Sequence, residues 1–252
     1  MQPPLLSYFP SLPLPQLRPA PALTDFDATP CAYLTGQVSR VRAFAAGGLS
    51  PEAYQALMDA NFRRSGRMVY QPICPACRAC AAIRVPVESF RPGKAQRRCW
   101  RRNADVKVTV AAPEPTPEKH ALYEKYQTQW HAGEHAWDFE SFASFLYDSP
   151  VDTREFEYRD AGGRLLGVGL CDVCARSVSS VYFYFDPALA RRGLGTFSAL
   201  YEIAFARAHG LPYWYAGYYV GGCASMIYKA TFRPCELLGA DGQWRPFSER
   251  PG

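Results

Sequence analysis

The sequence predicts an α+β fold in which a mixed sheet is flanked by helices. Two strand-like runs, at 163–173 and 179–186, flank a short turn and are typical of a hairpin. A glycine-containing turn at 191–196 then opens an amphipathic helical run, and another strand-like run begins at Leu211. The chain has 252 residues, of which 48% are hydrophobic and 20% charged, so it can bury a substantial core.

Residues 1–23 predict an extended, proline-stiffened arm. Seven prolines fall within the first 21 residues, and no charged segment precedes the leucines, so the pattern differs from that of a secretory signal. No apolar run approaches the ~18 residues that a membrane span needs. We therefore expect a cytoplasmic protein whose nine cysteines stay reduced.

Residues 24–110 predict a smaller N-terminal α/β region. Ser50 and Pro51 have the residue types of a helix cap and a first helical position, and a helical run follows them up to Phe62. Strand-like runs come next, at 68–73, 81–87 and 106–113.

Residues 111–252 predict a larger C-terminal core. A linker with three prolines opens it, and helical runs follow at 120–130 and 139–147. The remaining elements are expected as strands at 156–159, 163–173 and 179–186, a helix from Leu194 to Ala208 closed by His209 and Gly210, a strand at 211–217, a short helix at 226–232 and a strand near Trp244.

This order of elements resembles the acyltransferase core of the N-acetyltransferase (GNAT) superfamily. Glycines at a helix start leave backbone N–H groups open to a phosphate or another anion. The acetyl-CoA signature of that superfamily fits poorly, however. Aligning Gly193 and Gly195 with its glycines puts Ala190 where Arg or Gln is required, and starting at Arg192 puts Phe197 at the final small-residue position. The sequence therefore favours the GNAT-like fold more than the use of acetyl-CoA.

Positive charge is concentrated in one segment. From Arg63 to Lys107 there are twelve Lys or Arg and only two acidic residues, Glu88 and Asp105, which gives a local excess of +10. The whole chain carries +5, so the remainder sums to −5. A basic segment of this kind within a globular protein is typical of a site for a large polyanion.

Several short motifs stand in one order along nearly the whole chain. They are CAYL at 31–34, NFRRSG at 61–66, YQPICPACRAC at 70–80, IRVPV at 83–87, QRRCWRRN at 96–103, LYEKY at 122–126, SVYFYFDP at 180–187, LGT at 194–196, GYYV at 217–220 and MIYKATFRPCE at 226–236. This set resembles the arginyl-transferase family of aminoacyl-tRNA–protein transferases, and within it the short bacterial leucyl form.

The resemblance implies that an amino acid is transferred from its charged tRNA to the α-amine of a protein that begins with Asp or Glu. The product would then be marked for degradation. Leucine is favoured over arginine as the donated residue, although the sequence does not decide between them. Aminoacyl-tRNA and proteins with an acidic N-terminus are the implied partners, and no cofactor is required for the transfer.

Such a reaction uses a base, because an α-amine with a pKa of about 7.7–8.0 is mostly protonated at neutral pH. Asp186 and Glu236 are the candidate bases. The alternative is that Asp186 caps the turn at Pro187 and that Glu236 pairs with an arginine. Tyr182 and Tyr218 are candidates for orienting the substrate or stabilising the oxyanion, with core packing as the alternative.

Two groups of cations are expected to bind the two substrates. An acidic N-terminal side chain calls for arginine, whose planar fork can hold a carboxylate with two hydrogen bonds. The candidates for this role are Arg63, Arg64 and Arg84. Contacts to tRNA are expected from Arg97, Arg98, Arg101 and Arg102, and from Lys229 to the acceptor end.

Four cysteines form a candidate metal site. Cys74, Cys77 and Cys80 have CxxCxxC spacing, and together with Cys31 they could hold Zn or an iron–sulfur cluster. The alternative is a group of reduced, partly buried thiols. A second CxxC motif, at 171–174, ends the predicted hairpin and is interpreted as structural.

Two other functions stay open. The Gly193-Leu-Gly195 turn and the order of elements would also suit an acetyl-CoA-dependent N-acetyltransferase, which would leave the basic segment without a use. An RNA-binding module with a cysteine-held metal would use that segment but leave the C-terminal core unexplained.

Overall fold

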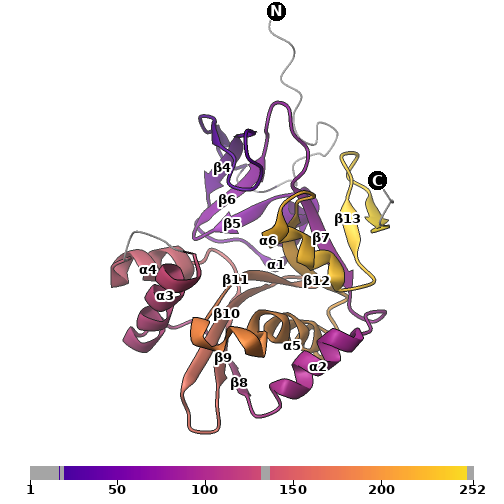
Figure 1. The fold of residues 1–252 in the computed structure, drawn as a ribbon. Helices are drawn as coiled ribbons and strands as arrows, with labels where there is room; N and C mark the ends of the chain where they lie inside the picture. The colour runs from indigo at the N-terminus through magenta and orange to yellow at the C-terminus, as the bar shows by residue number, and fades with distance from the viewer. Residues whose placement is uncertain (1–16, 18–19, 132–136, 249–252) are drawn as a thin grey trace, which may run out of the picture.

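The protein is built on one large and one small β-sheet, with helices packed around them (Figure 1). The computed structural model describes residues 17, 20–131 and 137–248. Most of the arm expected over residues 1–23 lies outside this range. The large sheet has the strand order β14-β13-β7-β12-β11-β10-β9-β8, and the small sheet has the order β1-β4-β6-β5.

The large sheet is mixed, as expected. Its strands are β7 (Ala81–Pro86), β8 (Lys107–Ala111), β9 (Thr153–Arg159), β10 (Leu165–Val173), β11 (Ser177–Phe185), β12 (Tyr213–Tyr219), β13 (Glu236–Leu238) and β14 (Trp244–Pro246). Within the described ranges, every pair of neighbouring strands is antiparallel except β11 and β12, which are parallel.

The remaining elements are shorter. The small sheet contains β1 (Thr24–Asp25), β4 (Val41–Ala45), β5 (Arg63–Ser65) and β6 (Met68–Pro72), and β2 (Thr29–Pro30) pairs with β3 (Val38–Ser39). The helices are α1 (Pro51–Asp59), α2 (Lys94–Arg102), α3 (Pro117–Trp130), α4 (Phe139–Leu146), α5 (Leu194–Ala208) and α6 (Ala224–Ile227), with 3₁₀ turns η1 (Pro187–Arg192) and η2 (Tyr228–Thr231). None of the helices in the described part of the chain combines the length and apolarity needed to cross a bilayer.

Helices α3 and α5 cover opposite faces of the sheet at β11. The Tyr182 and Tyr184 rings lie 6.1 and 5.5 Å from Tyr123 of α3, measured between centroids. Phe183, between them in sequence, points to the other face and meets Tyr158 at 5.6 Å, near the start of α5. The predicted GNAT-like order is therefore confirmed: a hairpin of β10 and β11, a glycine-containing turn, α5, and then β12.

The predicted start of the first helix is also confirmed. Ser50 is the N-cap of α1, and its Oγ accepts a hydrogen bond from the backbone N–H of Ala53 at 3.2 Å. Pro51 occupies the first helical position, where its missing N–H breaks no helical bond.

The boundary expected at residue 110 does not coincide with the division between the two sheets. Strands β7 and β8 come from the first predicted region, yet both are hydrogen-bonded into the large sheet. Helix α2, which was not predicted from the sequence, packs on α5 through Trp100, whose ring lies 5.2 Å from Phe197 and 6.2 Å from Tyr201 between centroids. The pairing of β7 with β12 and β13 joins residues that lie more than a hundred positions apart, which local patterns do not reveal.

Candidate active site

The parallel strands β11 and β12 start side by side and then part. Their pairing covers three registered positions, from Ser177 with Tyr213 to Ser179 with Tyr215. Just beyond, each strand has a register shift against its other neighbour, at Val181 on β11 and at Ala216 on β12. Such irregularities bend a strand. Open sheets bind ligands where the carboxyl ends of parallel strands diverge. We call the region beyond the last registered pair, between residues 180–182 of β11 and 216–218 of β12, the wedge.

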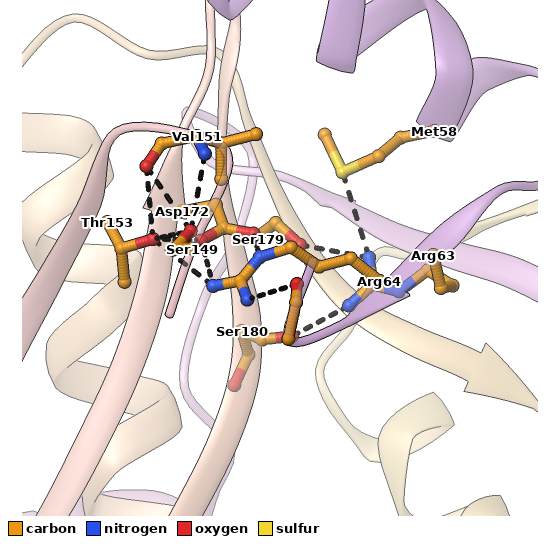
Figure 2. A network of polar contacts seen from close by, with 10 residues as sticks. Met58, Arg63, Arg64, Ser149, Val151, Thr153, Asp172, Ser179 and Ser180 are labelled. Atoms are coloured by element: carbon orange, nitrogen blue, oxygen red, sulfur yellow. Dashed lines mark hydrogen bonds and ion pairs between the residues drawn. The ribbon is translucent and has the colours of Figure 1, made fainter. Parts of the chain in front are cut away.

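One guanidinium group from the small sheet reaches the wedge. Arg63 of β5 is only 7% exposed. Its Nη1 donates to Ser179 Oγ at 2.9 Å, and its Nη2 donates to the Ser180 carbonyl oxygen at 2.7 Å (Figure 2). Both acceptors are neutral, so these bonds position the guanidinium group without compensating its charge.

Lys229 approaches the same place from η2. Its Nζ donates to the Tyr218 carbonyl oxygen at 2.8 Å. Gly217 has a φ of +89°. A Cβ atom at Gly217 would lie 3.4 Å from Lys229 Nζ and 3.6 Å from Arg63 Nη2. The two cationic groups therefore face the same bare backbone position.

The described residues supply no counter-ion for these two groups. Neither Arg63 nor Lys229 forms an ion pair with any carboxylate in the described parts of the chain. Burial and the nearby charge of Arg63 lower the pKa of Lys229 to about 7. Two cationic groups held close together away from water, with no carboxylate between them, form a site suited to an anion.

The role of Gly217 predicts a clear effect of adding a methyl group. We expect Gly217→Ala to lower kcat/KM at least about tenfold, because the new Cβ would occupy the point that both cations face. A matched control is Gly163→Ala: Gly163 also has a positive φ, of +83°, but nothing lies within 4 Å of its added Cβ. Both changes impose backbone strain of about 1–3 kcal/mol. If the two variants lose the same activity in kinetic assays, Gly217 has no special place in the site.

The other two arginines expected to bind the acidic terminus are already paired. Arg64 donates through Nε and Nη2 to the two carboxylate oxygens of Asp172, both at 2.7 Å, in a fully buried pair (Figure 2). Arg84 donates to Glu236 at 2.7 Å and lies between the Tyr213 and Trp244 rings. Of the three candidates, Arg63 alone lies at the wedge with no carboxylate among the described residues.

Asp186 and Glu236, the carboxylates expected as bases, also have cationic partners. Asp186 pairs with Lys125 at 2.6 Å and with Arg164, and its carboxylate caps η1 through the N–H of Ala188. Burial disfavours the charged form, yet these bonds hold the pKa of Asp186 below its ordinary value. Glu236 pairs with Arg84. These arrangements match the structural alternative stated for each residue.

The two tyrosines expected at the site differ in their surroundings. The Tyr218 hydroxyl is buried and donates to the Asn61 carbonyl oxygen at 2.8 Å, so it is engaged in holding the small sheet to β12. The Tyr182 hydroxyl accepts a hydrogen bond from Gln127 at 3.0 Å and is half-buried at the wedge. Of the two, Tyr182 is better placed to meet a substrate.

The arginines of the basic run lie on the exposed surface of α2 and line two cavities. Lys94, Arg98 and Arg102 face a cavity of about 510 Å³ that also includes Gly193 and Thr196 at the start of α5 and Thr231 of η2. Arg97 and Arg101 face a second cavity of about 350 Å³ beside Trp100. Thr231 belongs to η2, the turn that also carries Lys229.

The four cysteines expected at a metal site line one cavity. Cys31, Cys74, Cys77 and Cys80 surround a space of about 170 Å³ together with Tyr70 and other side chains. Burial, with a smaller effect of Cys74, Cys31 and Cys77, raises the pKa of Cys80 to about 12. In the described residues no three His, Cys, Asp or Glu side chains are arranged as a group of metal ligands.

A metal at these cysteines therefore remains a prediction from the sequence. Metal analysis of protein purified without oxygen tests it, and the expected result for a loaded site is about one Zn or one cluster per chain. Cys74→Ser should abolish that content, whereas Cys235→Ser, a buried cysteine elsewhere, should preserve it. Full transfer activity in a metal-free preparation would remove the metal from the reaction.

Sequence reasoning did not identify Gly217, Ser180 or Lys94 as parts of the site. A glycine within a strand-like run was the available signal for Gly217, since it often marks a bulge or a close approach. Ser180 acts through its backbone carbonyl, which has no sequence signature. Lys94 lies beside the cavity because it belongs to helix α2, which was not predicted.

Comparison with known proteins gives consistent matches along the chain. The N-terminal model of arginine-tRNA-protein transferase matches residues 29–98, and the C-terminal model of the same family matches residues 118–239. A protein from Gluconacetobacter diazotrophicus named aspartate/glutamate leucyltransferase is 40% identical, over 86% of this chain and 84% of its own. Proteins of the same name from Stenotrophomonas maltophilia (strain R551-3) and Agrobacterium fabrum are 40% and 37% identical, and the matches cover 87% and 93% of this chain and 90% and 98% of theirs. Among solved structures, FemX matches 81% of each chain at 10% identity with a TM-score of 0.45.

Proposed function

The chain belongs to the arginine-tRNA-protein transferase family, and from this premise we propose that it transfers leucine from leucyl-tRNA to proteins that begin with Asp or Glu. The relatives' name supports leucine as the donated residue and acidic N-termini as the acceptors. A new N-terminal leucine then marks the product for degradation. The structural observation that carries the proposal is Arg63 at the wedge, a guanidinium group that pairs with no carboxylate among the described residues and that faces Gly217 together with Lys229.

The wedge offers what this reaction needs. An aminoacyl ester on tRNA is already activated, so the enzyme has to hold the ester and the amine together, and positioning alone can contribute about 7–11 kcal/mol. Arg63 would hold the acidic side chain of the acceptor, because a guanidinium group binds a carboxylate with charge-assisted hydrogen bonds. Its own bonds to Ser179 and Ser180 keep it in place beforehand. No cofactor enters these steps, and the proposal places the enzyme in the cytoplasm, where charged tRNA is made.

The acceptor end of the tRNA would enter over α2. Lys94, Arg98 and Arg102 line a cavity at the start of α5, where free backbone N–H groups also favour a phosphate. This cavity reaches η2, so an RNA end bound there would present its ester towards the wedge. The second cavity, with Trp100 exposed and arginines beside it, could accept an unpaired base by stacking.

The arginines of α2 predict a measurable change in salt dependence. We expect Arg98→Ala to weaken tRNA binding and to reduce the slope of log affinity against log salt by about 0.7–0.9, because one phosphate contact is lost. Arg154→Ala is the control, since this exposed arginine lies on β9 and pairs with Asp152. Filter binding across a salt series measures both slopes. Identical slopes for the two variants would remove Arg98 from the tRNA interface.

A transfer assay tests the proposal as a whole. Purified protein is incubated with labelled leucyl-tRNA or arginyl-tRNA and with peptides that begin with Asp, Glu or Ala. We expect label from leucyl-tRNA to appear on the Asp and Glu peptides and not on the Ala peptide. Transfer from arginyl-tRNA alone would show that arginine, and not leucine, is the donated residue. Acetylation by acetyl-CoA without transfer from either tRNA would replace the function with that of an N-acetyltransferase.

A further inference from the structure

The reaction needs a group that takes a proton from the incoming α-amine, and the two carboxylates expected for that role are occupied by cations. Asp186 is held by Lys125 and Arg164, and Glu236 is held by Arg84. Resting on the proposed function, we propose that Lys229 is the general base, which takes a proton from the α-ammonium of the acceptor protein and returns it to the leaving 3′-oxygen of the tRNA.

Lys229 has the position that this role requires. Its Nζ donates to the Tyr218 carbonyl oxygen at 2.8 Å and to Met226 Sδ at 3.5 Å, and it faces the bare backbone of Gly217, as does Arg63. The carboxylate and the α-amine of an N-terminal Asp or Glu are only a few bonds apart. If Arg63 binds the carboxylate, the α-amine of the same residue therefore comes within reach of Lys229.

The surroundings of Lys229 favour the neutral amine. Burial disfavours the charged ammonium and lowers the pKa of Lys229, the positive charge of Arg63 on β5 lowers it further, and Cys223 and Cys80 act in the other direction. The hydrogen bonds of Lys229 in the described ranges go to neutral acceptors, the Tyr218 carbonyl oxygen and Met226 Sδ, and the hydroxyl of nearby Tyr218 donates to the Asn61 carbonyl oxygen. Burial is the largest effect, and the pKa of about 7 leaves a substantial neutral fraction at physiological pH.

The proton balance is closed within the site. The neutral Lys229 amine accepts a proton from the α-ammonium, and the freed nitrogen attacks the ester carbonyl, forming the C–N bond. As the bond from the carbonyl carbon to the ribose 3′-oxygen breaks, the leaving oxygen takes the proton from the Lys229 ammonium. A further proton is lost from the attacking nitrogen to solvent as the amide forms, and Lys229 returns to its neutral form.

An arginine substitution separates this role from simple binding of an anion. Lys229→Arg keeps a positive charge that cannot be lost, since guanidinium has a pKa above 12. We expect its kcat to fall by about 10²-fold or more. The matched control is Lys107→Arg, on the exposed edge strand β8, which should keep wild-type activity. Transfer by Lys229→Arg at a near wild-type rate would overturn the proposal, because charge alone would then suffice.

The pH dependence gives a second readout. A base must be unprotonated to act, so wild-type kcat should fall as the pH drops below about 7, at saturating leucyl-tRNA and peptide. This acidic limb lies below the pKa of about 7.7–8.0 of a free α-amine. In Lys229→Arg the fall in kcat below about pH 7 should disappear. The same fall in that variant as in wild type would overturn the proposal.

A titration that does not depend on activity distinguishes failure of this inference from failure of the proposed function. The chain has only five lysines, at 94, 107, 119, 125 and 229. Competitive acetylation with trace acetic anhydride, read by mass spectrometry across pH, should show Lys229 titrating near 7, well below the ~10.4 of a free lysine side chain. A Lys229 that titrates near that free value would contradict the inference even if wild-type protein transfers leucine, whereas absent transfer would contradict only the proposed function.

Discussion

Asp172→Asn is expected to destabilise the protein by about 3–5 kcal/mol, the effect of leaving a buried charge without its partner. Asp172 binds Arg64 through both carboxylate oxygens at 2.7 Å, and the two side chains are 0% and 1% exposed. Thr153 donates to the same carboxylate at 2.7 Å. Because Arg64 belongs to β5 and Asp172 to β10, the pair joins the two sheets, and its loss should be seen in denaturant unfolding.

Two matched variants serve as controls for the effect of Asp172→Asn on stability. Arg67→Ala breaks the exposed pair with Asp148, whose side chains are 45% and 44% exposed, and should change stability by only about 0–1 kcal/mol. The double variant Arg64→Met with Asp172→Leu removes both charges and should recover much of the loss, since apolar replacements of buried pairs are often tolerated. Equal destabilisation by Asp172→Asn and Arg67→Ala would show that the buried pair is not what holds β5 to the large sheet.

Arg63→Met is expected to raise the KM for an Asp-initiated peptide by roughly 10²-fold, while the affinity for leucyl-tRNA changes little. Truncating one partner of a buried charge pair costs about 2–5 kcal/mol, and 1.4 kcal/mol corresponds to a tenfold change. Among the described residues, Arg63 differs from its neighbour Arg64 in having only neutral acceptors, at Met58, Ser179 and Ser180. Its charge is therefore available to a substrate.

The kinetic assay varies peptide and leucyl-tRNA separately, and thermal unfolding confirms that the variant is folded. Arg42→Ala, which breaks an exposed pair with Asp25 on the small sheet, is the control and should leave both KM values near those of wild type. Equal loss for the two substrates in Arg63→Met would reject a specific role in holding the acidic terminus.

The sequence predicted the fold well where patterns are local. The hairpin of β10 and β11, the turn into α5, and the cap at Ser50 all follow from residues close together in the chain. The position of β7 could not be predicted in this way, because its neighbours in the sheet are β12 and β13. The alternation of apolar and polar residues predicts a strand, but it does not predict which distant strand lies next to it in the sheet.

The candidate site was predicted only in part, because the contacts that distinguish its residues are made by residues distant in the sequence. Arg63 and Arg64 are adjacent in sequence and identical in type, so the sequence offers no basis for separating them. Arg63 binds Ser179, whereas Arg64 binds Asp172, the cross-strand neighbour of Ser179, and only these partners, more than a hundred residues away, make the difference. Lys229 was predicted to contact tRNA, and the structure adds its closeness to Arg63 across Gly217.

A structure of the enzyme with a stable mimic of its donor tests the central claim most directly. The mimic is the terminal CCA trinucleotide of tRNA carrying leucine through a 3′-amide, which is not cleaved. We predict that its carbonyl carbon lies in the wedge, between Ser180 of β11 and Gly217 of β12, with the phosphates beside Arg98 and Arg102 of α2. A leucyl group bound outside the wedge, with Arg63 and Lys229 remote from it, would contradict this account.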